Sequence, residues 1–381
     1  MVASFAIHVL FLPRFFVITF SLCFFRVESN VSSCQKEKNT LLGFQRGLTD
    51  PYKLSLVSSW SDQEGSKISP SLVELEFLNY LDLRENFFNS TSIPSFLGSM
   101  VNLTHLDLHD AQFCGHISHQ LGNLSSLLYL NLKENNGLYV DKLHWMFHLS
   151  SMQHLDLSHT DLHREVDWLQ IVSSLSSLLE LILNNCQLDS LTPSVGFVNS
   201  TSLRVLNLSE NLFNQEIPNW FSNRSTSLLE YLNLRDNSLS GKIPDLLGQL
   251  KRLMDLDLSD NSLSGPIPSY LGNLSQMQAL LLGVNKLNGT VPKSLGLLSN
   301  LFALSISHNF FTSNLDEAHF SKLGKLKELE ISYTPLFFNV NSNWVPHFQL
   351  EYVSMISCKI GPNKLYIFTL SLLQSIIIFE M

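Results

Sequence analysis

The sequence predicts an α/β repeat solenoid, a right-handed superhelix in which short stacked units share one parallel sheet on the concave side. Three features predict this fold. An apolar pair recurs at steps of 24 to 26 residues, a polar residue usually follows each pair, and a Gly-x-Ile-Pro segment follows several of these. Such a period is typical of stacked units rather than of a globular core. The twelve pairs begin at Leu81, Leu106, Leu130, Leu155, Leu181, Leu206, Leu232, Leu256, Leu280, Leu304, Leu329 and Val353.

Each pair has the two-residue period of a β-strand, so Leu232 and Leu234 of the seventh unit point to the same side and enter the core. One unit cannot bury this apolar side alone, and its neighbours complete the burial. The segment 241–244 then turns the chain, because glycine permits unusual backbone angles and proline limits further pairing. Units four, five, eleven and twelve lack the segment, which predicts an irregular convex side there.

An asparagine follows most leucine pairs, as Asn237 does in the seventh unit. Its side-chain amide can donate to and accept from backbone groups of adjacent turns, which predicts a hydrogen-bonded ladder. Ala111 has no polar side chain and predicts a gap in the ladder. Four units carry a residue that hydrogen-bonds more weakly, and the two cysteines among them are expected to be buried thiols. These residues are Thr160, Cys186, Thr334 and Cys358.

Charged residues make up only 15% of the 381 residues and the net charge is −9, which argues against a nucleic-acid partner and permits a basic peptide or protein. Residues 1–29 are interpreted as an export signal, because Phe15–Phe25 is an apolar run preceded by Arg14. An uncleaved anchor is the alternative. Beyond residue 29 only Cys34, Cys114, Cys186 and Cys358 remain, so this is not a disulfide-dense scaffold.

Nine Asn-x-Ser/Thr sequons behind an export signal predict a glycosylated protein of the secretory pathway. One of them, Asn207, lies within a predicted strand and is expected to be too crowded for modification. The sequons begin at Asn30, Asn89, Asn102, Asn123, Asn199, Asn207, Asn223, Asn273 and Asn288.

Polar side chains beside the core leucines are expected to point out of the concave face. An acidic residue recurs between the two leucines, and basic residues recur in neighbouring columns. This pattern fits a track for a peptide or protein ligand, and it equally fits an ordinary solvated sheet. Replacing Asp82, Asp107 and Asp156 together is expected to weaken ligand binding. The full candidate set is Asp82, Arg84, Asp107, His109, Lys133, Asp156, His159, Arg235, Asp257 and Glu330.

Catalysis is not expected on this face. His105 and His109 share one side of a strand, but the adjacent strands offer Tyr129 with Lys133, or Tyr80 with Arg84, rather than further metal ligands. No nucleophile motif is present, and an open sheet does not isolate its acids from water. We therefore expect no enzyme activity, no metal and no cofactor.

The apolar tail 363–381 allows three interpretations. The first is a membrane anchor, but a 15-residue helix over 365–379 would span only about 22 Å, less than the roughly 30 Å of a bilayer core. As a second possibility, Leu373, Ile376 and Ile378 repeat the strand pattern 23 residues after Val353, which predicts a thirteenth strand that covers the end of the core. The third interpretation is a tail without a role.

These motifs resemble the plant extracellular leucine-rich-repeat class, and within it the receptor-like proteins of the ethylene-inducing-xylanase receptor and Cf-type resistance families. Residues 34–51 and Trp60 are similar to the family's helical N-terminal cap, and 68–72 to its entry into the repeats. The cap over 30–67 is incomplete, because the family's paired cysteines are missing between Trp60 and Ile68. The repeats cover 68–362, and the resemblance implies a truncated member.

The resemblance implies an extracellular recognition module, acting in plant defence, that binds a peptide or protein elicitor on the concave face. No kinase motif is present, so signalling would require a partner co-receptor kinase. The chain would lie at the outer face of the cell membrane, or be secreted if its tail is not an anchor. The alternatives are a soluble inhibitor or decoy, similar to polygalacturonase-inhibiting proteins, and a fragment without function.

Overall fold

The computed structural model describes residues 5–12, 15–22, 68, 70–191, 202–218, 228–341, 343–360 and 376–378. The chain divides into two compact units, an N-terminal unit over Met1–Gln187 and a C-terminal unit over Leu188–Met381. The predicted cap over 30–67 lies outside the described residues. The predicted repeat solenoid is confirmed, because a strand of a parallel sheet begins at or just before each of the twelve predicted positions.

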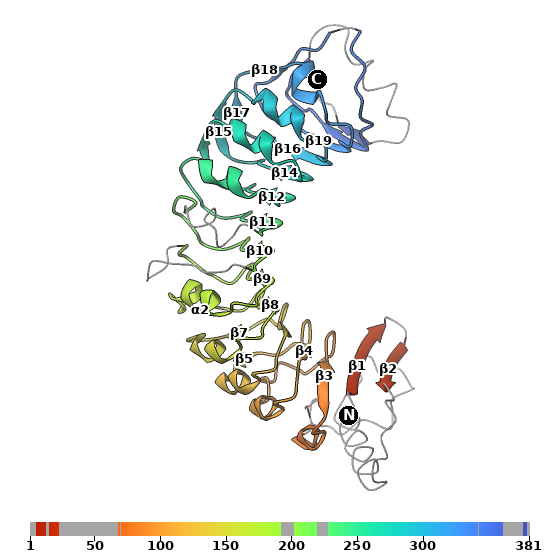
Figure 1. The fold of residues 1–381 in the computed structure, drawn as a ribbon, viewed down its shortest axis with the longest axis vertical. Coiled ribbons are helices and arrows are strands. Elements are labelled where there is room, and N and C mark those ends of the chain that lie inside the picture. The colour runs from red at the N-terminus through yellow and green to blue at the C-terminus, as the bar shows by residue number, and fades with distance from the viewer. Residues whose placement is uncertain are drawn as a thin grey trace. The chain divides into compact units, whose positions relative to one another are not determined.

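The N-terminal unit contains the first five of these strands, and short helices lie on the side opposite to the sheet (Figure 1). The core leucines of adjacent strands are paired in register, Leu81 with Leu106 and Leu106 with Leu130. The pairing continues through Leu155 to Leu181. The strands are β3 (Leu78–Asp82), β4 (His105–Asp107), β6 (Tyr129–Asn131), β8 (His154–Asp156) and β9 (Glu180–Ile182).

Two strands precede β3 in the sheet of this unit. They are β1 (Phe5–Leu12) and β2 (Phe15–Leu22), which form an antiparallel hairpin. β1 pairs in parallel with β3. The segment interpreted as an export signal therefore extends the sheet in this structure, and its role in export stays a prediction.

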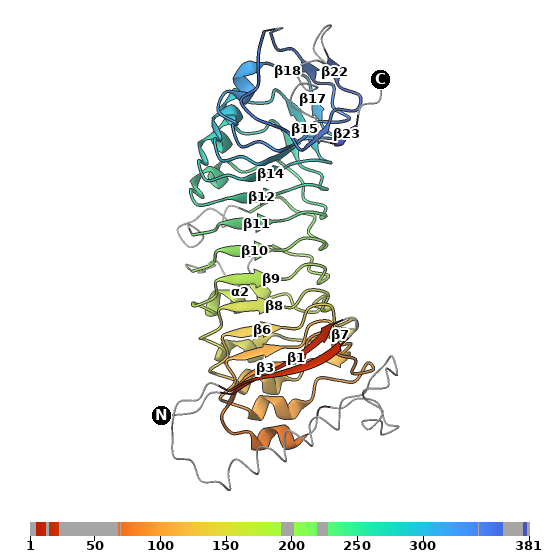
Figure 2. The same ribbon diagram turned by 90° about the vertical axis from the view of Figure 1, so that its right-hand side faces the viewer.

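The C-terminal unit stacks its strands as successive rungs (Figure 2). The strands are β10 (Val205–Asn207), β11 (Tyr231–Asn233), β12 (Asp255–Asp257), β14 (Ala279–Leu281), β16 (Ala303–Ser305), β19 (Glu328–Glu330), β21 (Tyr352–Ser354) and β23 (Ile376–Ile378). β23 pairs with β21 and confirms a thirteenth strand. The predicted register was wrong by one residue, because Val353 lies opposite Ile377 and so keeps the 24-residue step of most units.

The turns that leave the main sheet form small secondary strands. In the N-terminal unit these are β5 (Gly115–His116) and β7 (Leu138–Tyr139). In the C-terminal unit they are β13 (Ser264–Gly265), β15 (Lys286–Gly289), β17 (Phe310–Phe311), β18 (Asn314–Leu315), β20 (Phe337–Phe338) and β22 (Lys359–Ile360). Gly241, Gly265 and Gly289 have φ between 75° and 78°, which confirms the predicted unusual backbone angle of the Gly-x-Ile-Pro segment.

Single-turn 3₁₀ helices follow, and several begin directly after the segment's proline in an extended conformation, as at Pro268. The fourth repeat lacks the Gly-x-Ile-Pro segment and has an α-helix instead, α2 (Trp168–Ser174), in line with the predicted irregularity. The 3₁₀ helices are η1 (Pro70–Glu74), η2 (Ser95–Ser99), η3 (His119–Asn123), η4 (His144–His148), η7 (Asp245–Gln249), η8 (Ser269–Asn273), η9 (Lys293–Leu297) and η10 (Glu317–Phe320). None of the helices described is long and apolar enough to cross a bilayer.

The predicted asparagine ladder is present. Buried Asn285 donates to the carbonyls of Leu258, Leu282 and Gly283 at 2.8, 3.3 and 3.2 Å, and accepts from the amide of Leu263 at 2.9 Å. It thus connects its own turn to the preceding one. Asparagine at this position satisfies backbone groups that burial removes from water.

The substituted ladder positions behave differently from one another. Ala111 interrupts the side-chain ladder as predicted, but the amide of Phe88 donates instead to the Ala111 carbonyl at 3.1 Å. Thr160 has a buried hydroxyl without a hydrogen-bond partner among the described residues, which confirms weaker bonding there. Burial of Cys186 is confirmed and raises the pKa of its thiol. Cys358 is only half-buried, so full burial was wrong for this residue, although its thiol contacts the Ile331 carbonyl at 2.9 Å.

The residue before each ladder position has a left-handed backbone, with φ between 47° and 65°. This requirement was not predicted from the sequence. Asparagine and aspartate tolerate the conformation, whereas a β-branched residue is strained in it. The twelve residues are Glu85, Asp110, Glu134, His159, Asn185, Glu210, Asp236, Asp260, Val284, His308, Tyr333 and Ser357.

Val284 is the β-branched exception, with φ 53°, and it is 45% exposed. We expect Val284→Asn to stabilise the C-terminal unit by about 1 kcal/mol, because asparagine relieves the strain and little apolar contact is lost. Urea unfolding followed by circular dichroism measures the change. The matched control is Asp236→Asn at φ 52°, which should leave the midpoint unchanged. A lower midpoint for Val284→Asn would contradict the strain argument.

Five sequon asparagines are exposed, as modification requires: Asn89, Asn102, Asn123, Asn273 and Asn288. Asn207 is half-buried in β10, and its Oδ1 accepts from the amide and hydroxyl of Ser209 at 3.1 and 2.9 Å, in agreement with the expected crowding. Asn30, Asn199 and Asn223 lie outside the described residues. Glycosylation itself stays a prediction.

Candidate ligand-binding face

The sheet face is defined here as the outward side of the parallel sheet, formed by the residues that alternate with the core leucines. Its acidic residues in the N-terminal unit are buried, since Asp82, Asp107 and Asp156 are 0, 2 and 5% exposed. Each Oδ1 accepts the amide two residues later, at 3.2, 3.1 and 2.9 Å. These carboxylates hold the turn after the strand. Their burial makes them less accessible than outward-pointing positions suggest, and their role in ligand binding stays a prediction.

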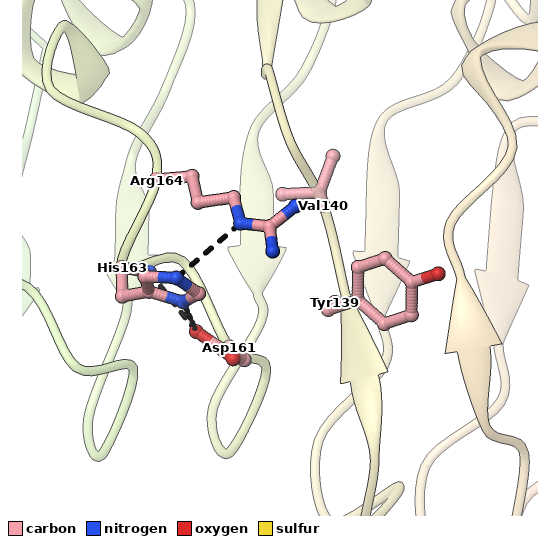
Figure 3. Close-up of a pocket in the computed structure, with 5 residues that line it drawn as sticks. All are labelled: Tyr139, Val140, Asp161, His163 and Arg164. Atoms are coloured by element: carbon pink, nitrogen blue, oxygen red, sulfur yellow. Dashed lines mark hydrogen bonds and ion pairs between the residues drawn. The ribbon is translucent and has the colours of Figure 1, made fainter.

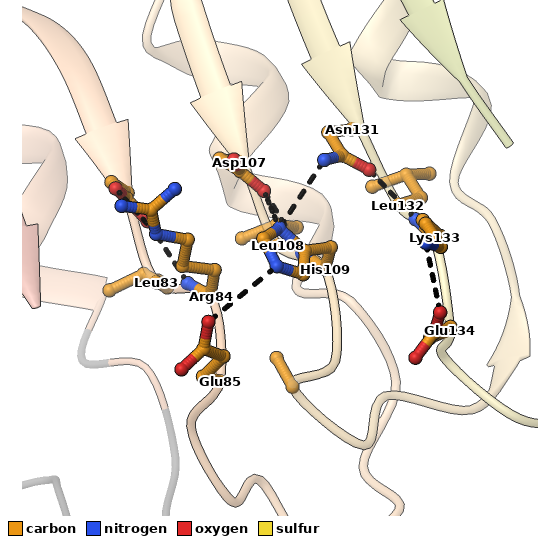
Figure 4. Close-up of polar contacts among 12 residues, drawn as sticks. Leu83, Arg84, Glu85, Asp107, Leu108, His109, Asn131, Leu132, Lys133 and Glu134 are labelled. Carbon is orange, nitrogen blue, oxygen red and sulfur yellow. Dashed lines mark hydrogen bonds and ion pairs between the residues drawn. The ribbon is translucent and has the colours of Figure 1, made fainter. Parts of the chain in front are cut away.

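A row of cationic side chains lies beside this acidic column, in the turns just after three successive strands (Figure 4). Arg84 Nε lies 3.4 Å from Asp82 Oδ2, and Lys133 Nζ lies 3.0 Å from Glu134 Oε1. Between them, His109 is hydrogen-bonded to Asp107. The side chains of Arg84, Lys133 and His109 are 35, 41 and 23% exposed, respectively. They are held in place by acids and remain partly accessible, so a ligand could contact the cationic row without reorganising it.

His109 and Asp107 form the tightest pair of the row. Nδ1 of His109 lies 2.9 Å from Asp107 Oδ1, and Nε2 lies 3.9 Å from Glu85 Oε1. The hydrogen bond to Asp107 raises the pKa of His109, against the opposing effect of partial burial. Burial acts to raise the pKa of Asp107, but the hydrogen bonds from the His109 side chain and backbone outweigh it and lower that pKa.

These shifts predict a pH dependence of stability in the N-terminal unit. A raised histidine pKa stabilises the fold below the unfolded value of about 6.5, and this contribution is lost as the pH rises through the folded pKa. We expect the urea midpoint of the native chain to decrease as the pH rises above about 6.5. His109→Gln should remove that part of the slope, whereas exposed His148→Gln should retain it. Equal slopes for the two variants in urea titrations would exclude the Asp107–His109 pair as the source.

A column of stacked rings runs along the same strands, at the position before each first leucine. Tyr80, His105, Tyr129 and His154 stack with ring centroids 3.9, 4.1 and 4.3 Å apart and nearly parallel planes. The column ends at an ion pair in which His154 Nδ1 lies 2.7 Å from Glu180 Oε2. Burial raises the pKa of Tyr129 to about 12, so its phenol stays neutral at physiological pH.

The ring column was missed from the sequence as a site. Its signal was the alternation of tyrosine and histidine at one fixed position of four successive units. Because ring faces cover each other, the half-buried edges carry the available hydroxyl and imidazole groups. The column therefore offers a ligand a rigid line of hydrogen-bonding groups.

The remaining candidate residues are distributed over both units. In the N-terminal unit, His159 is half-buried and its Nδ1 lies 3.1 Å from Asn185 Nδ2. In the C-terminal unit, Arg235 Nε lies 3.1 Å from Asp260 Oδ2. Asp257 accepts from Ser259, and Glu330 from the Ser305 hydroxyl at 2.8 Å. The structure brings five of the candidates together as neighbours: Asp82 and Asp107 at the ends of β3 and β4, and Arg84, His109 and Lys133 in the turns just after β3, β4 and β6.

Metal binding at His105 and His109 gains no support from the geometry. His105 is stacked between two tyrosines, and His109 Nδ1 is engaged with Asp107. Within the described ranges, no cluster of three or more His, Cys, Asp and Glu side chains could hold a metal ion.

A hollow of about 270 Å³ lies on the flank of the N-terminal unit, away from the ring column. It is lined by Tyr139, Val140, Asp161, His163 and Arg164 (Figure 3). His163 Nδ1 lies 2.6 Å from Asp161 Oδ1, and Arg164 Nη1 lies 2.8 Å from Asp141 Oδ1. Its charged groups already compensate one another, so it has less free bonding capacity than the sheet face.

Comparison with known proteins agrees with this geometry. The family described as "Leucine-rich repeat region" matches residues 34–265. "Receptor-like protein EIX1" of Solanum lycopersicum is 37% identical over an alignment 294 residues long, which covers 64% of this chain and 28% of that relative. "Receptor-like protein 6" of Arabidopsis thaliana is 30% identical over an alignment 196 residues long, which covers 49% of this chain and 19% of that relative. The chain thus spans less than a third of the length of these relatives.

Two solved structures are similar in fold. The crystal structure of PEPR1–AtPEP1 has a TM-score of 0.62 and 26% identity, and covers 77% of this chain and 44% of its own. The second is the ectodomain of the Arabidopsis thaliana receptor kinase GASSHO1/SCHENGEN3 in complex with CASPARIAN STRIP INTEGRITY FACTOR 2. It has a TM-score of 0.59 and 26% identity, and the match covers 82% of this chain and 46% of that structure's chain.

A parallel sheet of stacked leucine pairs, with an asparagine ladder in the following turns and an open sheet face, defines the class of leucine-rich-repeat solenoids. The chain belongs to the leucine-rich-repeat family, and its relatives are plant leucine-rich-repeat receptor-like proteins.

Proposed function

We propose that this chain is an extracellular recognition module that binds a peptide or protein ligand on the sheet face. The observation that carries the proposal is the arrangement of the N-terminal unit, where a stacked ring column lies on successive strands and a row of cations lies in the turns just after them. A pre-ordered surface binds with a smaller entropy cost than a mobile one. The similar structures that were solved with AtPEP1 and with CASPARIAN STRIP INTEGRITY FACTOR 2 support this class of ligand.

The finer role follows from the relatives. From the resemblance to Cf-type resistance proteins, the proposal includes a role in plant defence, with an elicitor as the ligand. The proposal includes a co-receptor kinase as the signalling partner, as the resemblance to receptor-like proteins implies. The site of action is the outer face of the cell membrane or the extracellular space.

Binding of a displayed peptide library to the full chain, secreted from plant cells and immobilised, tests the proposal. One sheet-face charge is reversed in each unit, by Lys133→Glu and by Asp255→Lys. The matched controls, Lys325→Glu and Asp245→Lys, change exposed charges off the sheet face. We expect recovered peptides to lose binding to at least one sheet-face variant and to neither control. Peptides that depend only on the control positions, or no enrichment at all, would refute the proposal.

A further inference from the structure

The sheet face of the C-terminal unit has a charge pattern unlike that of the N-terminal unit. Two parallel rows of outward-facing residues cross strands β12, β14, β16 and β19. The pairing register of these strands determines which residues form each row. Each row begins and ends with an acid and has uncharged residues between. The first row is Asp255, Ala279, Ala303 and Glu328, and the second is Asp257, Leu281, Ser305 and Glu330.

The acids of the first row lie without a counter-ion in the described part of the chain. Among the residues that the structure describes, the carboxylates of Asp255 and Glu328 make no hydrogen bond or ion pair, and Asp255 is half-buried. Burial raises the pKa of Asp255, as expected for a carboxylate that lacks a cation. The cations at the two ends are engaged elsewhere, Arg235 with Asp260 and Lys327 with Glu351.

The centre of this surface is apolar and low. Ala279 and Ala303 have short side chains, Leu281 is apolar and half-buried, and Gly283 has no side chain. Large apolar side chains stand at both ends of these strands, with Phe302 44% exposed before β16 and Val284 45% exposed after β14. Exposed apolar groups around a shallow floor are typical of a surface that a partner covers.

The spacing of the acids selects one kind of partner. Neighbouring strands lie about 4.8 Å apart, so the three steps from β12 to β19 cover about 14 Å. An extended peptide rises about 3.4 Å per residue and points every second side chain to the same face, so residues i and i+4 lie about 14 Å apart on one face. The side chain at i+2 then falls over the middle of the floor.

We propose that the C-terminal sheet face binds an extended peptide with basic side chains at positions i and i+4 and an apolar side chain at i+2. The basic side chains pair with Asp255 and Glu328, and the apolar one packs on Ala279, Ala303 and Leu281. The peptide crosses the strands, so its backbone leaves the sheet hydrogen bonds intact. This inference rests on the proposed function and names the ligand's chemistry for this part of the face.

The test compares synthetic twelve-residue peptides by fluorescence anisotropy with the full chain. One peptide carries lysine at i and i+4 with leucine at i+2, the second places the lysines at i and i+3, and the third replaces both lysines with glutamate. We expect the first to bind about tenfold more tightly than the others, since two exposed ion pairs contribute up to about that factor. Equal binding of the first two peptides would overturn the inference, because the spacing would not matter.

Variants of the chain locate the site. Asp255→Asn with Glu328→Gln should weaken the first peptide about tenfold, while Glu216→Gln with Asp245→Asn, which removes two exposed acids off the sheet face, should not. Val284→Asn serves as a second variant, because it is expected to stabilise the fold and still weaken binding, so a loss cannot come from unfolding. Unchanged binding to the Asp255 and Glu328 variant would overturn the inference.

The two proposals fail separately. Library peptides that lose binding to Lys133→Glu, but bind the Asp255 and Glu328 variant normally, would refute the basic-peptide inference and leave sheet-face recognition intact. A chain that enriches no sheet-face peptide of any kind would refute both.

Discussion

Gly272→Ala is expected to destabilise the C-terminal unit by about 3 kcal/mol, a large effect for a single added methyl group. Gly272 lies in η8, and a Cβ there would stand 2.2 Å from the Ser294 carbonyl oxygen and 2.4 Å from its carbon. Both atoms belong to the backbone of the next turn. The clash can therefore be relieved only by moving two stacked repeats apart. Gly98 and Gly296 make the same close approach, at 2.1 and 2.3 Å.

The matched control is Gly324→Ala. A Cβ at Gly324 would have its nearest neighbour, the His347 carbonyl oxygen, at 4.0 Å. We expect this variant to unfold at the native urea midpoint, measured by circular dichroism. If the two variants unfolded at the same midpoint, close stacking of the turns would not be what requires glycine at position 272.

Asn285→Ala is expected to lower the free energy of unfolding by about 2 kcal/mol. The substitution removes three donated hydrogen bonds and one accepted bond, all to backbone groups. The loss of unfolding free energy is less than the sum of four hydrogen bonds, because a backbone group can replace one of them. At Ala111, which lacks the amide side chain, the backbone carbonyl accepts the amide of the preceding turn. We expect the backbone carbonyl at position 285 to take over the amide of Leu263 in the same way.

Asn300→Ala is the control for the ladder position. Asn300 is partly exposed, donates to the Ser275 carbonyl at 2.9 Å and accepts from Lys325 at 2.8 Å. Because water can replace both partners, we expect the free energy of unfolding, measured in urea, to fall by less than about 0.5 kcal/mol. A loss at position 285 no larger than at position 300 would show that the ladder does not stabilise the stack.

The repeat and its strand positions were predictable because burial alone determines them. A leucine pair must enter the core in every unit, and the constant step then aligns Leu81 with Leu106 and each later pair with its neighbour. The Gly-x-Ile-Pro turn was predictable for a similar reason, since only the local backbone matters there. The register of β23 was missed by one residue, because its apolar run offers several equivalent alignments.

The candidate site was predicted less well, because its properties arise between units. The acidic column suggested ligand contacts, but Asp82, Asp107 and Asp156 are buried and hold backbone amides two residues on. No sequence motif predicts these side-chain-to-backbone bonds, or the left-handed residue in the turn that follows. The ring column of Tyr80 and its neighbours depends on stacking across a 25-residue step.

Photo-crosslinking tests the central claim, that ligand binds on the sheet face, most directly. A photoreactive amino acid is placed at Lys133, at Glu328 or, as the off-face reference, at Lys325, and each chain is irradiated with a labelled library-selected peptide. The account predicts crosslinks from position 133 or 328 and none from 325. Crosslinks confined to position 325, with both sheet-face positions unlabelled, would contradict it.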